Sequence, residues 1–475
     1  MPEYRKISTL KTADEFAAYV KELGVSLPFA ANTRTGSKSP FGRGIEYKGR
    51  GIGNRWCVLP MEGWDCLPDG SPGELTERRW LRFARSGAKL LYGCEAAAVM
   101  KSGRSNTRQM MLSENSVANI AALRKKMLNE HEKAFGRTDD LYIGIQLTHS
   151  GRFAHPDNDM KLASRTAYCH PLLDRKFGNN ADCVVSDDEV RDIIRHFIKA
   201  AKLARQAGFD FVDIKHAHGY LGHEFLSAVK RNGDYGGSFE NRTRFFREIA
   251  AGIRREVPEL DISLRLSIFD WLPFEKGPDG VGKAMDWKGE YKYAFGGDGS
   301  GFGYNLNEPA AFIRIAQEYG VKMICTTVGS PYYNPHIQRP AFYPVIDGYL
   351  PPEDPLRGVA RQINAVAELK KLCPEALFIG SGYTYLQEWL PNVGEAVIEN
   401  GMADFIGIGR MVLSYPEICA DSLAGKSLDR RHICRTFGDC TNAPRCGLVS
   451  GCYPLDGFYK AGDEAEKLKL FKRRK

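Results

Sequence analysis

Four side chains that can carry or position a proton lie close together in the chain: Lys215, His216, His218 and Tyr220. They directly follow a mostly apolar run at residues 211–214, which predicts a β-strand. Ligands in parallel α/β folds bind where strands end, because backbone and side chains there point into an open crevice. The cluster therefore predicts an active site at this strand end. The alternative, a strand end whose His and Lys side chains only face water, is disfavoured by the rest of the chain.

Short strand patterns alternate with longer amphipathic patterns along most of the sequence, which indicates parallel βαβ units. Eight such units close naturally into a barrel, so we predict an α/β fold of the (β/α)8 TIM-barrel class. The expected strands are Trp56–Met61, Lys89–Tyr92, Leu141–Leu147, Phe211–Lys215, Ile262–Leu266, Lys322–Thr326, Ala376–Ile379 and Asp404–Ile408. The expected helices are Glu74–Ser86, Ser113–Phe135, Asp187–Ala207, Phe239–Glu256, Glu308–Tyr319, Arg357–Leu372, Leu386–Asn400 and Pro416–Leu423.

Three segments lie outside this alternation. Residues 1–50 form an N-terminal lead-in with a short helical pattern near Thr12–Leu23, residues 51–425 form the barrel, and residues 426–475 form a Cys-containing C-terminal extension. The segment after the fifth strand, Phe269–Asn307, is long and rich in Gly and aromatic residues. Loops of this length without regular structure are usually lids or binding loops, so we expect one here.

The segment after the His and Tyr cluster carries a second motif. The run Asp234–Ser238 reads Asp-Tyr-Gly-Gly-Ser, and Glu240, Asn241 and Arg242 follow it. This stretch resembles the old yellow enzyme family of FMN-dependent oxidoreductases, which includes 2,4-dienoyl-CoA reductase-like members, and the resemblance covers roughly residues 50–425. It implies a TIM barrel that binds FMN, takes hydride from NAD(P)H and reduces an electron-poor alkene such as an α,β-unsaturated carbonyl compound.

The other strand ends carry side chains that suit a flavin. Gln146 can pair with the pyrimidine edge in both senses, and the Arg265 guanidinium would stabilise the negative charge of reduced flavin. Glycine backbone N–H groups at 380–382 can approach a phosphate that Arg410 grips bidentately, in the place where TIM barrels usually bind phosphate. The expected cofactor-binding residues are Pro60, Met61, Glu62, Ala96, Gln146, Arg265, Gly380, Ser381, Gly382, Gly409 and Arg410.

The resemblance also implies roles on the substrate side. Tyr220 is the expected proton donor to the substrate α-carbon, and Trp64 is expected to shape the pocket. Lys215 and His218 occupy the pair of positions that holds the substrate oxygen, although the family has His at the first of them. A cationic Lys215 would favour an anionic or strongly polarised substrate, unless it pairs with Glu62 or Glu95 and never touches substrate. Glu62 stands near the expected flavin N5/O4 edge, where relatives carry Thr or Cys.

Two other functions stay open. One is a flavin amine dehydrogenase or demethylase on the same fold. The other is a cofactor-free Schiff-base lyase that uses Lys215 as its nucleophile and binds a substrate phosphate through Arg265 and the strand ends at 380–410. A built-in dinucleotide domain is not expected, because no G-x-G-x-x-G motif follows a strand.

Cysteines recur every six residues in the extension, at Cys434, Cys440, Cys446 and Cys452. Four thiolates could hold zinc or a [4Fe–4S] cluster. The iron–sulfur members of the family, however, use a C-x2-C-x3-C spacing that this chain lacks, with Phe437 where the second ligand would fall. We therefore expect no metal site here.

The composition is that of an ordinary globular enzyme, with 43% hydrophobic residues and a net charge of +8. The basic run at 467–475 is a solvated tail rather than a nucleic-acid or membrane site. The charged N-terminus is no secretory signal, no apolar stretch could span a bilayer, and the twelve mostly scattered cysteines favour a reduced, cytoplasmic compartment. We expect a small-molecule substrate and leave a homo-oligomer open.

Overall fold

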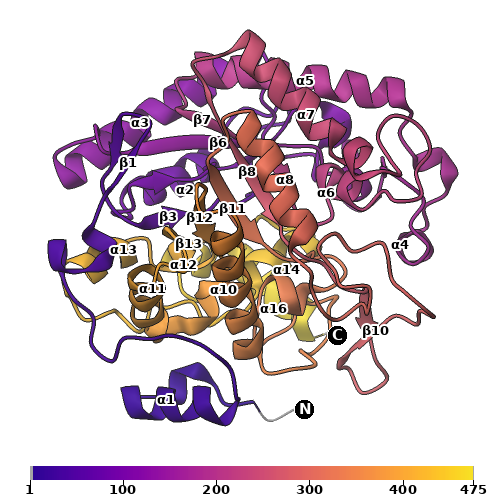
Figure 1. The fold of residues 1–475 in the computed structure, drawn as a ribbon. Coiled ribbons are helices and arrows are strands. Elements are labelled where there is room, and N and C mark those ends of the chain that lie inside the picture. Colours follow the sequence, from indigo (N-terminus) through magenta and orange to yellow (C-terminus); the bar gives the residue numbers. More distant parts are fainter. Residues whose placement is uncertain (1–3, 474–475) are drawn as a thin grey trace.

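The chain folds into a closed parallel barrel with helices around it (Figure 1). This computed structural model describes residues 4–473. Each barrel strand pairs in parallel with the next, and the last returns to the first, so the sheet has no open edge. The predicted (β/α)8 barrel is confirmed. Its strands are β3 (Trp56–Val58), β4 (Leu90–Leu91), β6 (Tyr142–Thr148), β7 (Phe211–His216), β8 (Asp261–Ser267), β11 (Met323–Thr327), β12 (Leu377–Gly380) and β13 (Phe405–Ile408).

The helices form where the amphipathic patterns predict them. In α5 (Asp187–Gln206), Ser186 and Glu189 form a capping box, and acidic residues fill the first turn. One stripe of α5, including Val190, Phe197 and Ala201, is buried against the barrel. The other large outer helices are α2 (Glu74–Ala84), α3 (Val117–Phe135), α7 (Phe239–Glu256), α8 (Asn307–Glu318), α10 (Pro355–Leu372), α11 (Leu390–Glu399) and α13 (Ile418–Leu423).

The long loop expected after the fifth barrel strand is present and follows β8, although it contains one short piece of regular structure. Strands β9 (Phe274–Lys276) and β10 (Gly282–Ala284) pair as an antiparallel hairpin. Its turn contains Asp279 and Gly280, and the positive φ of 80° at Gly280 is one that glycine adopts without strain. The hairpin stiffens this loop beside the barrel. Another short strand that the sequence patterns missed, β5 (Ala96–Ala98), pairs with β6.

A second hairpin closes the amino-terminal end of the barrel. Strands β1 (Ile45–Tyr47) and β2 (Arg50–Ile52) are joined by Lys48 and Gly49, which both have the positive φ of a two-residue hairpin turn. Tyr47 and Ile52 are buried among residues that point into the barrel. The members of this inner cluster are Tyr47, Ile52, Cys57, Leu59, Leu90, Tyr92, Tyr142, Phe211, Met323, Cys325, Ile379 and Phe405.

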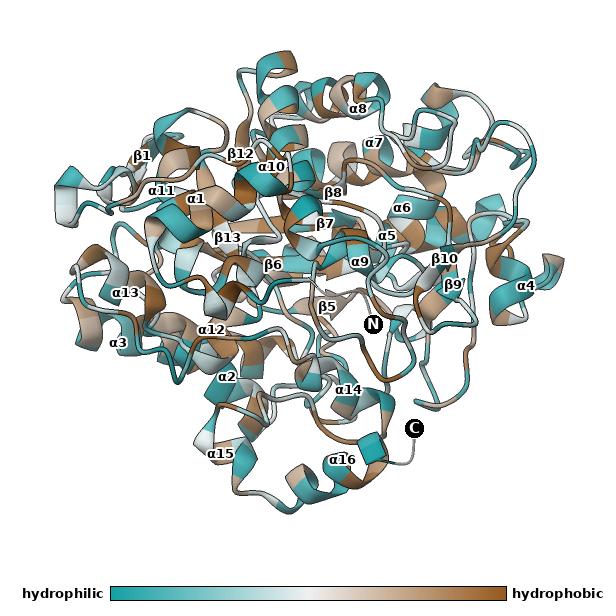
Figure 2. Ribbon diagram, turned by 90° about the horizontal axis from the view of Figure 1, so that it is seen from below, coloured by the Kyte–Doolittle hydropathy of each residue, from teal (hydrophilic) through white to brown (hydrophobic). Residues whose placement is uncertain are grey.

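The C-terminal extension packs beside α2. Its helices are α14 (Asp439–Arg445), α15 (Gly457–Lys460) and α16 (Asp463–Arg473), and they gather on one side of the barrel (Figure 2). Arg78 of α2 fastens the extension, because its guanidinium lies 2.9 Å from Asp456 and 4.4 Å from the ring centroid of Phe458. Among residues 4–473, none of the helices has the length and apolar character needed to cross a bilayer.

Candidate active site

A cavity of about 260 Å³ opens at the carboxyl-terminal ends of the barrel strands. The site residues predicted in the barrel line it, with two exceptions. Gly380 ends β12 just outside the lining, and His216 points away from the cavity and packs against Phe245, Phe246 and Phe312. The prediction therefore brought together side chains that are as far apart in sequence as Pro60 and Arg410. They meet because all the barrel strands are parallel and share one carboxyl end.

One wall of the cavity presents donors that have no protein acceptor. Arg265 is only 5% exposed, yet its guanidinium makes no hydrogen bond or ion pair within residues 4–473, and its Nε is buried without a partner. Beside it, Gln146 donates from Nε2 to Asp213 at 2.5 Å, which leaves the amide oxygen of Gln146 available. Buried donors without partners are rare in native proteins, so Arg265 indicates an acceptor supplied by a ligand.

The ends of β12 and β13 form a cradle of small residues. Gly382 has a φ of 89°, and a Cβ added there would lie 2.7 Å from the Gln362 side chain. Gly409 has open space on its cavity side, because an added Cβ would meet only the Met61 sulfur, at 3.9 Å. The Arg410 guanidinium lines the same region and makes no hydrogen bond or ion pair with another described residue. This donor set fits a phosphate group.

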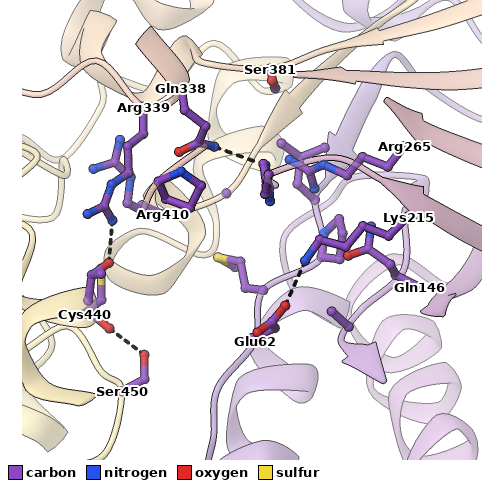
Figure 3. A pocket seen from close by; sticks show the side chains of 18 of the residues that line it. Glu62, Gln146, Lys215, Arg265, Gln338, Arg339, Ser381, Arg410, Cys440 and Ser450 are labelled. Carbon is purple, nitrogen blue, oxygen red and sulfur yellow. Dashed lines mark hydrogen bonds and ion pairs between the residues drawn. The ribbon is translucent and has the colours of Figure 1, made fainter. Parts of the chain in front are cut away.

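Glu62 is the centre of a polar network in the cavity (Figure 3). Lys215 Nζ donates to Glu62 Oε1 at 2.9 Å, and the Tyr220 hydroxyl lies 3.1 Å from both carboxylate oxygens. Ser105 Oγ and Trp64 Nε1 also donate to Glu62, at 2.7 and 3.1 Å. Lys215 Nζ in addition lies 3.7 Å from the ring centroid of Tyr220. The Glu62 carboxylate thus links the ammonium group of Lys215 to the hydroxyl of Tyr220.

The sequence left two possible partners for Lys215, Glu62 and Glu95, and the structure distinguishes between them. Glu95 is already occupied by the Arg79 guanidinium at 2.5 Å and by the backbone N–H of Gly63 at 3.0 Å. Glu62 is therefore the partner of Lys215. Burial lowers the pKa of Lys215, and the Glu62 carboxylate offsets part of that change. Burial alone would raise the pKa of Glu62, but the Lys215 charge and the donated hydrogen bonds outweigh it and hold that pKa below its usual range.

Tyr220 and His218 both stay neutral in this environment. Burial and the neighbouring Glu62 carboxylate raise the pKa of Tyr220 well above its usual value. Burial, Arg265 and Lys215 hold the pKa of His218 well below its usual range. Gln338 Nε2 lies 3.2 Å from His218 Nε2, and with the amide in this orientation it donates to that nitrogen, which assigns the ring proton to Nδ1. Tyr220 is therefore a phenol and His218 a neutral imidazole at pH 7.

The backbone fixes His218 in an unusual conformation. Its φ of 67° lies in the left-handed region, which is uncommon for residues other than glycine. Its N–H donates to Ser267 Oγ at 3.1 Å, and its carbonyl accepts from Ser330 Oγ at 2.7 Å. Ser267 is the last residue of β8 and Ser330 follows β11, so the barrel itself holds the strained residue in place.

Two groups of lining residues were missed from the sequence. The first follows β11 and includes Tyr332, whose hydroxyl lies 3.1 Å from that of Tyr220. This group could have been predicted, because the carboxyl ends of all barrel strands face the same cavity and no site residue had been assigned to the end of the sixth strand, β11. The second comes from the extension and gave no such signal. The missed residues of these two groups are Pro331, Tyr332, Gln338, Arg339, Thr441, Pro444, Arg445 and Ser450. Three single residues at other strand ends were missed as well: Leu59, Thr384 and Gly407.

The cysteines of the extension differ in their burial. Cys434 and Cys452 are buried, while Cys440 and Cys446 are half-buried, and Cys440 lines the cavity. Within the described chain, no group of three or more His, Cys, Asp or Glu side chains is arranged to hold a metal ion. We assign no metal or iron–sulfur role to these residues.

Comparisons with known proteins agree with the fold. The family model described as NADH:flavin oxidoreductase / NADH oxidase family matches residues 44–294. The NADPH dehydrogenase of Bacillus cytotoxicus is 26% identical over 419 residues, which cover 86% of this chain and 98% of that protein. Among solved structures, 2-naphthoyl-CoA reductase aligns with a TM-score of 0.63 at 18% identity, over 90% of this chain and 58% of that one. The old yellow enzyme homologue from Zymomonas mobilis aligns with a TM-score of 0.55 at 17% identity, over 82% and 94%.

Proposed function

The chain belongs to the NADH:flavin oxidoreductase / NADH oxidase family, and we propose that it is an FMN-dependent NAD(P)H oxidoreductase that reduces an electron-poor alkene. Bound FMN would supply the hydride relay between NAD(P)H and the alkene β-carbon. The observation that carries the proposal is the pairing of two features in one cavity. Arg265 and Arg410 offer guanidiniums without protein acceptors, and the same cavity contains the phenol of Tyr220.

The residues of the cavity would hold FMN at both ends. The Gln146 amide and the Arg265 guanidinium suit the pyrimidine edge of the flavin. The β12 and β13 ends suit its phosphate, through the glycine backbone, Ser381 and Arg410. The remaining predicted contacts with the cofactor are Pro60, Met61, Glu62 and Ala96, which line the same cavity.

On the substrate side, His218 is the residue that we propose holds the developing oxyanion. Its Nδ1 proton is available, because Gln338 occupies only Nε2. A single donor of this kind is worth about 10²–10³ in rate. Lys215 is engaged by Glu62, so we give it a supporting role: its charge lies over the Tyr220 ring and balances the carboxylate.

Tyr220 would protonate the α-carbon of the substrate. Its raised pKa keeps the proton on the phenol at neutral pH, which is the form that a general acid requires. Glu62 fixes the position of the hydroxyl through two equal contacts of 3.1 Å. Because a carboxylate only accepts, the phenolic proton lies toward Glu62 in this arrangement, and protonation of the α-carbon requires the hydroxyl to turn from Glu62 to the substrate.

Two measurements test this function. The absorption spectrum of the purified protein should show flavin bands, and denaturation should release FMN. Tyr220→Phe should then retain flavin reduction by NAD(P)H but lose about 10²–10⁴ in alkene reduction, the usual contribution of a general acid. Tyr385→Phe is the matched control, because that hydroxyl is buried without a partner and lies outside the cavity lining. A colourless protein that takes up no added FMN would refute the cofactor, and unchanged alkene reduction in Tyr220→Phe would refute the proton donor.

The Schiff-base lyase alternative fits the cavity less well. A nucleophilic lysine must be neutral, whereas the 2.9 Å contact with the Glu62 carboxylate favours the charged form of Lys215. Borohydride trapping with phosphorylated carbonyl compounds should therefore leave Lys215 unmodified.

A further inference from the structure

The roof of the cavity is built partly from the C-terminal extension. Helix α14 contributes Cys440, Thr441 and Arg445 to the lining, and the short helix α9 (Pro335–Gln338) leads into Arg339 on the facing side. Arg339 Nη1 donates to Thr441 Oγ1 at 2.7 Å, which joins the two segments above the cavity. Figure 3 shows the Arg339 side chain turned toward the extension, next to Arg410.

Arg339 is a cation without an anionic partner. Its Nη2 is buried and makes no hydrogen bond, and among residues 4–473 no carboxylate lies within ion-pair distance of it. Burial and the positive charges of Arg445 and Arg410 lower its pKa. A guanidinium in such surroundings is stabilised by an anion that can accept two parallel hydrogen bonds.

The local charge balance is positive. Arg445 pairs with Asp347 at 2.8 Å, but the Asp347 side chain is 54% exposed, so water screens that pair. Arg410 has no protein partner, and the β12 and β13 ends already offer it a phosphate cradle. The charge of Lys215 is cancelled by Glu62. Arg339 therefore differs from the other cations of the cavity. No described carboxylate pairs with it, and it is not part of the phosphate cradle at the ends of β12 and β13.

We propose that Arg339 and Arg445, together with the Thr441 hydroxyl, form an anion subsite that binds a carboxylate or phosphate group of the substrate. The inference rests on the proposed function, and it moves the preference for anionic substrates from Lys215 to the cavity roof. Gln338 contacts His218 and is followed directly by Arg339. The subsite thus adjoins the residue that would hold the reacting oxygen, so one substrate could reach both.

A pair of enones tests the subsite in the FMN-loaded enzyme: 3-benzoylacrylate, which carries a carboxylate beyond its alkene, and its methyl ester. The kcat/KM ratio of acid to ester is measured for the parent, Arg339→Gln and Arg445→Gln, and the two Kd values follow from perturbation of the flavin spectrum. We expect the parent to prefer the acid and each variant to lower the ratio at least tenfold, with the ester changed less than twofold. Arg431→Gln, an 86% exposed arginine of the same extension, is the matched control and should change nothing.

Three results would overturn the inference. Equal or undetectable binding of the acid by the parent would remove the need for an anion subsite. Weaker FMN binding in Arg339→Gln with an unchanged acid-to-ester ratio would assign Arg339 to the cofactor phosphate. Loss of a preference for NADPH over NADH with that ratio unchanged would assign it to the nucleotide. Failure of the parent to bind FMN at all is a different outcome, which refutes the proposed function as well.

Discussion

Replacing Glu62 by Gln should destabilise the protein strongly, although the two side chains have nearly the same shape. The Lys215 side chain is only 4% exposed, and Glu62 is the carboxylate that its ammonium group contacts. Breaking a buried pair by removing one partner costs about 3–5 kcal/mol. The loss also has an upper bound at pH 7, because Lys215 can shed its proton. Moving from an ordinary pKa of about 10.4 to pH 7 at 1.36 kcal/mol per unit gives about 4.6 kcal/mol.

The same reasoning sets the pH dependence. In Glu62→Gln the pKa of Lys215 falls in the folded state and stays ordinary in the unfolded chain. The unfolded state then binds more protons below pH about 10, so stability rises with pH and the deficit shrinks toward that value. Urea unfolding followed by circular dichroism at pH 7 and pH 9.5 measures both terms.

A double variant separates lost charge pairing from general damage. Glu62→Gln combined with Lys215→Met removes both partners and should recover about 2 kcal/mol or more relative to Glu62→Gln alone. Glu77→Gln is the matched control, because its pair with Lys126 is 40% and 54% exposed and should be worth less than about 1 kcal/mol. A loss below about 1 kcal/mol in Glu62→Gln at pH 7, or a deficit that neither pH nor the second substitution changes, would refute the account of this pair.

Further outcomes follow from single sites. Gly382→Ala should lower the free energy of unfolding by about 1–3 kcal/mol, because the φ of 89° and the 2.7 Å approach to Gln362 disfavour a side chain. Gly447→Ala is the control, since an added Cβ there meets no heavy atom within 4 Å and only the positive φ is unfavourable. Thermal unfolding of the two variants measures the difference. Arg410→Gln should weaken FMN binding at least tenfold, about 1.4 kcal/mol, measured from flavin fluorescence on titration, and unchanged affinity would exclude Arg410 from the phosphate site. Burial raises the pKa of Asp213 to about 6, so its carboxyl stabilises the fold at low pH and that contribution is lost as pH rises from about 4 to 6. Asp213→Asn should therefore gain about 2–3 kcal/mol relative to the parent between pH 4 and pH 7 in urea unfolding, and a constant difference would contradict the raised pKa.

The fold was predictable because its signals are local and repeated. Each barrel strand is a short apolar run, and each helix carries one buried stripe, as α5 shows with its capping box at Ser186. The cavity residues of the barrel were predictable for a topological reason: parallel strands place all their carboxyl ends together. Short strands without a long apolar run, such as β5 and β9, carried too little pattern to be found.

The pairing inside the cavity was harder to predict. Glu62 and Glu95 were both acceptable partners for Lys215, and the choice depends on Arg79, which reaches Glu95 from α2. The position of Arg79 beside Glu95 depends on how α2 packs in three dimensions, and no sequence pattern predicts it. The position of Arg445 in the cavity lining could not be predicted for a similar reason. The sequence of an extension beyond the last strand does not indicate which end of the barrel it covers.

The β1–β2 hairpin at the base of the barrel has a consequence for how the chain is made. Tyr47 and Ile52 leave the ribosome early, yet their cluster includes Phe405 from the last strand. Contacts this distant in sequence form slowly, because the chain must close a very long loop before they contribute. The nascent protein therefore carries an unfilled apolar base until synthesis is almost complete. A chain that stops before β13 would keep that surface exposed and would be a substrate for chaperones or for aggregation rather than a smaller stable barrel.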